Sequence, residues 1–157
     1  MTYHIRVRPT ALIIENDKIM LIEYMDENGV YYNLPGGGAE PGETVIEGVK
    51  REVLEETNSE VDVGSLAFVY ECAPHKQSGE YSGTKHSLNL IFECYLKEGS
   101  IPRQPEYIEG IQTAVRWVSM DELDSIILYP NIKTYLKEYV RGTKLELKEI
   151  LMRGKRL

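Results

Sequence analysis

The sequence predicts an α/β fold in which a mixed sheet lies between helices. Segments with the apolar and alternating patterns of strands stand both before and after one helical segment at residues 44–57, which favours this arrangement. The composition is that of an ordinary globular protein, with 42% hydrophobic residues in a chain of 157. A chain of this length can bury one sizeable core, so we expect a single domain over residues 1–157.

Strands are expected before the helical segment, and tight turns separate them. Asn28-Gly29 is a dipeptide typical of hairpin turns. Prolines and glycines between residues 35 and 42 interrupt regular structure and lead into the helical segment. The predicted strands in this part of the chain are Ile5–Ile14, Lys18–Tyr24 and Val30–Leu34.

The helix predicted at Thr44–Thr57 carries signals at both ends. Thr44 and Glu47 have the spacing of a capping box, in which each side chain binds the backbone of the other residue. Asn58 follows the last turn and tolerates the left-handed conformation that often ends a helix. An apolar stripe for packing against the sheet is expected from Ile46, Val49 and Val53.

The second half of the chain is expected to supply three more strands and three short helices. The strands are Glu60–Cys72, Lys85–Leu96 and Ile111–Val118, and the helices are Met120–Ser125, Ile132–Tyr139 and Leu145–Met152. Cys72 and Cys94 lie in apolar strands without the spacing of a metal site, so we expect reduced thiols in the core. A disulfide is the alternative, and it needs an oxidising compartment.

The net charge and the N-terminal sequence limit which partners and which location we expect. A net charge of −7 argues against a general binder of the nucleic-acid backbone. It does not exclude a small phosphate substrate, because bound divalent ions reverse the local charge. The N-terminus lacks the apolar stretch of a signal peptide and no apolar run reaches membrane-spanning length, so a cytoplasmic protein without a membrane partner is expected.

The acidic cluster of the predicted helix is the main candidate for chemistry. Glu52, Glu55 and Glu56 have the spacing i, i+3 and i+4, which places all three on one helix face. Like charges so close repel each other, and cations would relieve the repulsion. Oxygen ligands alone suit Mg²⁺ or Mn²⁺. A solvated acidic face is the alternative, and it is the usual meaning of such a cluster.

The wider context of this cluster resembles a known motif. Gly37, then Glu43 after five residues, then the run from Arg51 to Glu56 after seven more is similar to the Nudix box of the Nudix hydrolases. Asn58 and Ser59 depart from the glycine and the aliphatic residue that end the family pattern. The resemblance implies a Nudix-type α/β/α sandwich with a mixed sheet. It also implies divalent metal-dependent hydrolysis of a diphosphate bond in a small nucleotide.

The resemblance also implies roles for individual residues. Glu52, Glu55 and Glu56 would hold the ions, with the Gly36 carbonyl as a further ligand. Glu43 and Arg51 would form an ion pair that braces the loop on the helix. Members of the family often take another acid from the loop before the late tryptophan, where this chain offers Glu106 and Glu109. Of the two, Glu109 is our candidate for an extra ligand or the general base, and an exposed loop glutamate is the alternative.

Four residues outside the motif are candidates for binding the substrate. They are Arg6, Arg8, Tyr32 and His86. The arginines alternate along the first predicted strand and could face an anionic substrate or solvent. The tyrosine could stack on a base or pack in the core, and the histidine could contact phosphate or serve the structure only.

The substrate class stays open at this point. A nucleoside diphosphate linked to another group, such as ADP-ribose or a nucleotide sugar, is the leading expectation, because Pro74 lies about where the family carries a proline associated with ADP-ribose cleavage. The alternatives are a nucleoside triphosphate pyrophosphohydrolase and a nucleotide-sensing module without catalysis. Many members of the family are dimers, so a homodimer is a further expectation.

Overall fold

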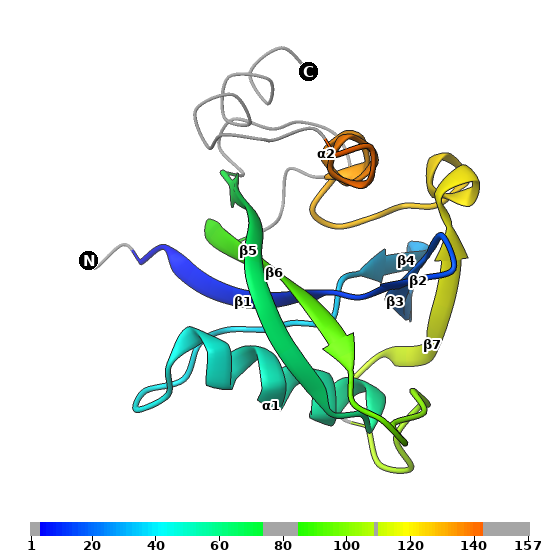
Figure 1. Cartoon of the computed structure of the whole chain (residues 1–157). Helices are drawn as coiled ribbons and strands as arrows, with labels where there is room; N and C mark the ends of the chain where they lie inside the picture. The colour runs from blue at the N-terminus through cyan, green and yellow to red at the C-terminus, as the bar shows by residue number, and fades with distance from the viewer. Residues whose placement is uncertain (1–3, 74–84, 109, 143–157) are drawn as a thin grey trace.

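The computed structural model describes residues 4–73, 85–108 and 110–142 (Figure 1). Seven strands, two α-helices and one 3-10 helix (η3) are described in these ranges. In chain order they are β1 Arg6–Leu12, β2 Ile14–Glu15, β3 Lys18–Asp26, β4 Gly29–Asn33, α1 Val45–Thr57, β5 Val61–Cys72, β6 Ser87–Leu96, β7 Gln112–Ser119, η3 Met120–Ser125 and α2 Lys133–Val140.

The strands form two sheets. The first has the order β1-β6-β5, with β1 parallel to β6 and β5 antiparallel to it, so this sheet is mixed. The second is antiparallel and consists of β2, β3, β4 and β7, with β3 pairing with each of the others. The mixed sheet that the sequence predicts is confirmed, whereas the second sheet was not part of the prediction.

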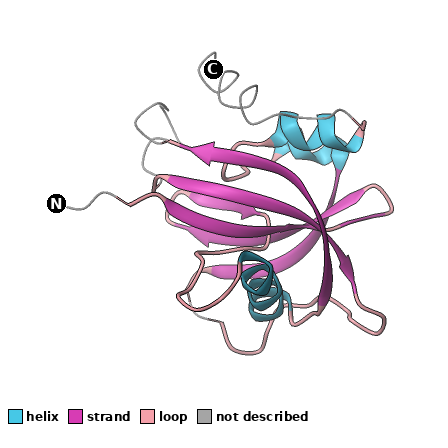
Figure 2. Cartoon of the chain, turned by 60° about the vertical axis from the view of Figure 1, so that its left-hand side comes forward, coloured by secondary structure: helices cyan, strands magenta, loops and turns pink. Residues whose placement is uncertain are grey.

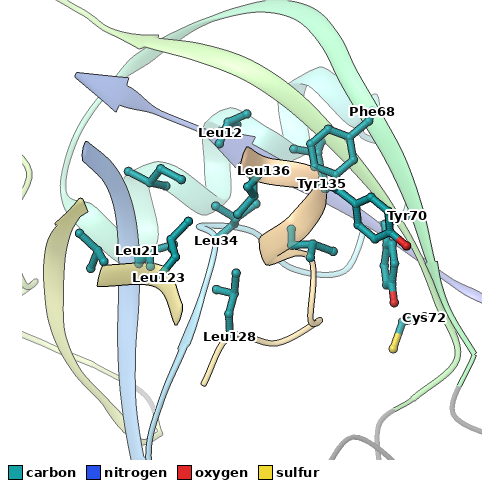
Figure 3. Packing of buried hydrophobic residues seen from close by; sticks show 14 residues of the cluster. Leu12, Leu21, Leu34, Phe68, Tyr70, Cys72, Leu123, Leu128, Tyr135 and Leu136 are labelled. Carbon is teal, nitrogen blue, oxygen red and sulfur yellow. The ribbon is translucent and has the colours of Figure 1, made fainter. Parts of the chain in front are cut away.

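Helices cover the strands on both sides (Figure 2). Helix α1 lies on one side, where Val49 and Val53 pack in a buried cluster with residues of β1 and β6 such as Ala11 and Phe92. Helix α2 and η3 lie on the other side, over a larger apolar cluster (Figure 3). The labelled members of this second cluster are Leu12, Leu21, Leu34, Phe68, Tyr70, Cys72, Leu123, Leu128, Tyr135 and Leu136.

Helix α1 begins and ends where its sequence signals place it. The amide of Glu47 donates to Thr44 Oγ1 at 3.1 Å and the amide of Thr44 donates to Glu47 Oε2 at 3.2 Å, which completes the capping box. Asn58 ends the helix in the left-handed conformation, with φ of 53°. The prediction for Ile46 is wrong, because this side chain is 44% exposed. The buried face of the helix begins only at Gly48.

Other boundaries differ in smaller ways. The strand expected at Ile5–Ile14 is interrupted at residue 13, where β1 has ended and β2 has not begun. Cys72 and Cys94 are both buried free thiols, as expected. The helix expected at Leu145–Met152 lies outside the described residues. In the part of the chain that the structure describes, no helix combines the length and apolar character that crossing a membrane requires.

Candidate active site

The glycine-rich segment after β4 runs beside β1. The amide of Ala11 donates to the Pro35 carbonyl at 2.8 Å, and the amide of Gly37 donates to the Pro9 carbonyl at 3.3 Å. A Cβ at Gly36 would stand only 2.7 Å from the Pro9 carbonyl oxygen. Glycine is therefore required for this close backbone approach.

The same segment also touches helix α1. A Cβ at Gly37 would stand 2.5 Å from Cδ of Glu52, and a Cβ at Gly38 would stand 2.7 Å from Nε of Arg6. The backbone of the three glycines thus lies between a carboxylate of α1 and a guanidinium of β1. Without side chains, this backbone can approach both groups closely.

Arg51 ties the loop to the helix through a group of acidic side chains. Its Nε and Nη2 donate to the two oxygens of Glu43 at 2.9 and 2.7 Å, in a bidentate pair. Its Nη1 donates to Glu52 at 2.8 Å and to Glu55 at 3.4 Å, and Nη2 also donates to the Gly38 carbonyl at 3.2 Å. The Arg51 guanidinium lowers the pKa of Glu43 to about 2. The sequence resemblance predicts this bracing role for the same pair.

Glu56 occupies a different environment. One carboxylate oxygen accepts from the Gly36 amide at 2.8 Å and the other accepts from the Tyr24 hydroxyl at 2.8 Å. Burial nevertheless raises the pKa of Glu56 to about 7, and the nearby charge of Glu52 acts in the same direction. The charge of Arg8 lowers this pKa in part, and Nη2 of Arg8 donates to the Gly36 carbonyl at 3.0 Å.

The oxygen atoms of this region are of the kind that a divalent ion prefers, but in this structure they do not converge on one position. Glu52, Glu56 and the Gly36 carbonyl offer only oxygen, which Mg²⁺ and Mn²⁺ prefer. The raised pKa of Glu56 marks a buried carboxylate that lacks sufficient positive charge. Among the described residues, no three His, Cys, Asp or Glu side chains converge in the manner of a formed metal site. Glu52 is bonded to Arg51 and Glu55 is 57% exposed, so a metal ion would have to rearrange these contacts.

A cavity of about 560 Å³ opens in front of these groups. Pockets of this size commonly hold ligands as large as a nucleotide. Three cationic side chains, those of Arg6, Arg8 and Lys85, line it together with Glu52. The remaining lining residues are mostly polar or small: Tyr24, Asn33, Gly36, Gly37, Cys72, Ser87, Asn89, Tyr129 and Pro130.

Tyr32, which the sequence analysis assigned to the substrate, does not line this cavity. Its hydroxyl donates to Glu23 Oε2 at 2.9 Å, and its ring packs against the cluster beneath α2. Successive residues of a strand point to opposite faces, so its neighbour Tyr31 points the other way. Tyr31 stacks on Tyr24 with 5.3 Å between the ring centroids, and its edge contact with Tyr129 has the same separation.

His86 is also directed away from the cavity. Its Nε2 lies 2.7 Å from Oε1 of Glu71 on β5. The residues on either side of it, Lys85 and Ser87, line the cavity instead. Of the four predicted substrate residues, the structure therefore brings Arg6 and Arg8 to the cavity and leaves Tyr32 and His86 elsewhere.

The loop before β7 is held beside the end of α1. The side-chain amide of Gln112 donates to the Glu56 carbonyl at 2.8 Å, and the amide of Arg103 donates to the Thr57 carbonyl at 2.9 Å. Glu106 on this loop is exposed. Glu109, our candidate base, lies outside the described residues, and so does Pro74.

Several cavity residues were not identified from the sequence. They are Tyr24, Asn33, Lys85, Ser87, Asn89 and Tyr129. A signal was available for two of them, because the run from Ser87 to Leu90 alternates polar and apolar residues at the period of a strand. Asn89 is only 2% exposed, and its amide donates to the Tyr70 carbonyl at 3.3 Å and to the Ser87 hydroxyl at 3.2 Å.

Comparison with known proteins gives consistent matches. The profile of the family described as NUDIX domain matches residues 5–140. An ADP-ribose pyrophosphatase from Methanocaldococcus jannaschii is 33% identical over 109 residues, which cover 68% of this chain and 63% of that protein. The nucleoside triphosphatase NudI from Enterobacter sp. (strain 638) is 27% identical over 123 residues, which cover 74% of this chain and 84% of that protein.

A solved structure supports the fold. A NUDIX hydrolase from Nitrosomonas europaea superposes with a TM-score of 0.70 and 24% identity, covering 93% of this chain and 95% of that one. The α/β/α sandwich expected from the sequence resemblance is thereby confirmed.

Proposed function

Because this chain is a Nudix hydrolase, we propose that it cleaves the diphosphate bond of a nucleoside diphosphate linked to a second group, such as ADP-ribose or a nucleotide sugar. We propose Mg²⁺, or Mn²⁺ in its place, as the ion it requires. One observation carries the proposal: Glu52 of α1 and the backbone of Gly36 and Gly37 line a cavity together with three cationic side chains. Acidic and cationic groups together suit a substrate whose phosphates bind both metal ions and arginines.

The oxygens proposed to hold the metal come from α1 and from the glycine segment. Glu52, Glu56 and the Gly36 carbonyl are the first candidates, and the exposed Glu55 is a further one. A bound divalent ion supplies neutralisation of phosphate charge and a water molecule of lowered pKa. Arg51 keeps Glu52 beside Gly37, so its contribution is to orient a ligand.

The cavity residues are proposed to place the two parts of the substrate. Arg6, Arg8 and Lys85 would bind phosphate oxygens through charge-assisted hydrogen bonds. Asn33 and Tyr129 offer an amide and an aromatic ring to the nucleoside. Glu109 remains our proposal for the general base. Gln112, three residues later at the start of β7, donates to the Glu56 carbonyl.

A nucleoside triphosphate is the second candidate substrate. Three cations in one cavity would also suit a third phosphate, and the Enterobacter relative is named a nucleoside triphosphatase. The two candidates differ in their products. Cleavage of a linked diphosphate gives a nucleotide and a phosphorylated remainder, whereas triphosphate cleavage gives a nucleotide and pyrophosphate.

A substrate panel tests both candidates. The protein is incubated with ADP-ribose, a nucleotide sugar and the common nucleoside triphosphates in Mg²⁺, in Mn²⁺ and in EDTA, and the products are separated by ion-exchange chromatography. The leading proposal predicts metal-dependent release of nucleoside monophosphate from ADP-ribose or the nucleotide sugar. Pyrophosphate release from a triphosphate alone would favour the second candidate. Tight nucleotide binding without turnover would indicate a sensor and contradict both.

A further inference from the structure

Arg8 stands among the oxygens that we assign to the metal. Its Nη2 donates to the Gly36 carbonyl at 3.0 Å, and Glu56 and Glu52 are the carboxylates that act on its charge. Arg6 is a second cation close enough to act on its charge. A guanidinium in this place supplies part of the positive charge that a divalent ion would otherwise bring.

Arg51 is the only other arginine bonded to this group of oxygens in the described residues, and it is fixed far more firmly. It binds Glu43 through two hydrogen bonds and binds Glu52, Glu55 and the Gly38 carbonyl as well. Within the described ranges, the Arg8 side chain makes the single hydrogen bond to Gly36. Arg8 is therefore the cation that fewer hydrogen bonds hold in place.

A divalent ion and the Arg8 guanidinium compete for the same surroundings. Both are cations that would contact the Gly36 carbonyl and lie near Glu56, so each repels the other. Arg8 also lines the cavity, where it can turn toward a bound anion without leaving the site. If Arg8 moves from the Gly36 carbonyl to a substrate anion, metal binding and substrate binding favour each other.

We propose that Arg8 is the internal counter-ion of the metal-free site, and that a divalent ion displaces its guanidinium from the Gly36 carbonyl and frees it to bind a substrate phosphate. The proposal rests on the proposed function, because it takes the acidic face of α1 as the metal site. Arg8 then weakens metal binding to the free protein. Since coupling between two ligands is reciprocal, a phosphate anion that engages Arg8 should strengthen it.

The test is a Mn²⁺ titration of the intact protein without nucleotide, in which electron paramagnetic resonance measures the free Mn²⁺ at each step. Arg8→Met removes the charge and keeps a long apolar stem, and Arg6→Met is the matched control that removes a neighbouring charge. We expect Arg8→Met to lower the Kd for Mn²⁺ about tenfold, as the loss of a competing charged hydrogen bond would. Arg6→Met should lower it about threefold or less, the size of a screened charge effect.

A second titration measures the coupling, with inorganic pyrophosphate as the probe. Pyrophosphate should lower the Kd for Mn²⁺ at the wild-type site by a larger factor than in Arg8→Met, after correction for the Mn²⁺ that pyrophosphate binds in solution. Arg8→Lys, which keeps the charge without the planar fork, should give an intermediate Kd and serves if the methionine variant does not fold.

The outcomes separate this inference from the proposed function. Equal effects of Arg8→Met and Arg6→Met, or weaker Mn²⁺ binding in Arg8→Met, would overturn the inference while metal-dependent hydrolysis could still stand. No Mn²⁺ binding to the wild-type protein would overturn both.

Discussion

Two groups of acidic side chains beside the glycine segment differ in the positive charge that each one contacts. Around Arg51, four acidic side chains lie within 3.5 Å of one guanidinium, and the bidentate pair with Glu43 fixes its position. Around Glu56, a buried carboxylate has two neutral donors and a single neighbouring arginine, which itself bonds to a carbonyl. In the first group, Glu43, Glu52 and Glu55 accept hydrogen bonds from a guanidinium. In the second, Glu56 accepts hydrogen bonds from a hydroxyl and a backbone amide.

This difference distinguishes residues that stabilise the fold from residues that we expect to take part in the chemistry. A carboxylate that already accepts a hydrogen bond from a guanidinium gains less from an added ion. A buried carboxylate with a raised pKa gains much from a cation, and such groups cluster at functional sites. We therefore assign the brace to Arg51 and the metal-dependent chemistry to the surroundings of Glu56.

The largest effect is expected from Glu56→Gln. Loss of a charged metal ligand should lower kcat/KM for the best substrate of the panel by about a thousandfold or more. The fold should persist, because glutamine keeps a carbonyl oxygen that can accept one of the two hydrogen bonds. Glu60→Gln, an exposed acid just beyond α1, is the control and should retain full activity. Near-normal turnover by Glu56→Gln would contradict the assignment.

The pH dependence of stability without metal should reveal the same carboxylate. The folded pKa of about 7 lies above the ordinary value of 4.5, so the folded state holds the proton more tightly than the unfolded state. The contribution of Glu56 is complete below pH 4.5 and is lost as pH rises through 7. Urea unfolding in EDTA should therefore show wild type losing about 3 kcal/mol relative to Glu56→Gln across this window. Parallel curves for the two proteins would place Glu56 in a water-exposed setting.

Arg51→Ala tests the brace. Glu43 and Glu52, whose side chains are each 13% exposed, would lose their shared partner, so the Tm should fall by about 5 °C and turnover should fall with it. Arg51→Lys keeps the charge but not the bidentate geometry, and an intermediate Tm is expected. An unchanged Tm in Arg51→Ala, with turnover lost, would mean that Arg51 acts on the substrate directly.

The smallest effects are expected at two tyrosines on adjacent strands, each of which donates a hydrogen bond to a glutamate. Tyr24→Phe and Tyr32→Phe should each cost about 1 kcal/mol of unfolding free energy. Only Tyr24→Phe should change catalysis, by about fivefold to tenfold, because its hydroxyl holds Glu56. Equal activities of the two variants would contradict the placement of the site on the Tyr24 face.

Local signals made α1 predictable, and the family resemblance predicted its brace. The capping box at Thr44 and the left-handed residue Asn58 act within one turn of the helix, so they fix its ends whatever the rest of the chain does. The Glu43–Arg51 pair spans eight residues across one loop and two helix turns. The extent of the buried helix face was not predictable in the same way, since it depends on where the sheet begins, and Ile46 lies before that point.

The surroundings of Glu56 depend on contacts distant along the chain. Tyr24 is 32 residues from Glu56, and Arg8 is 28 residues from Gly36. The register between β3 and β4 pairs Tyr24 with Tyr31, and this pairing decides that Tyr32 faces the other side. A shift of one residue would exchange the faces, and sequence patterns alone did not specify which of two adjacent tyrosines lies near the site.

The most direct test of the central claim is the anomalous scattering of crystals soaked in Mn²⁺, recorded at the manganese absorption edge. We predict a peak within coordination distance of the carboxylates of Glu56 and Glu52 and of the Gly36 carbonyl. A peak at another place on the protein, or none at saturating Mn²⁺, would contradict the metal-dependent chemistry assigned to this face of α1.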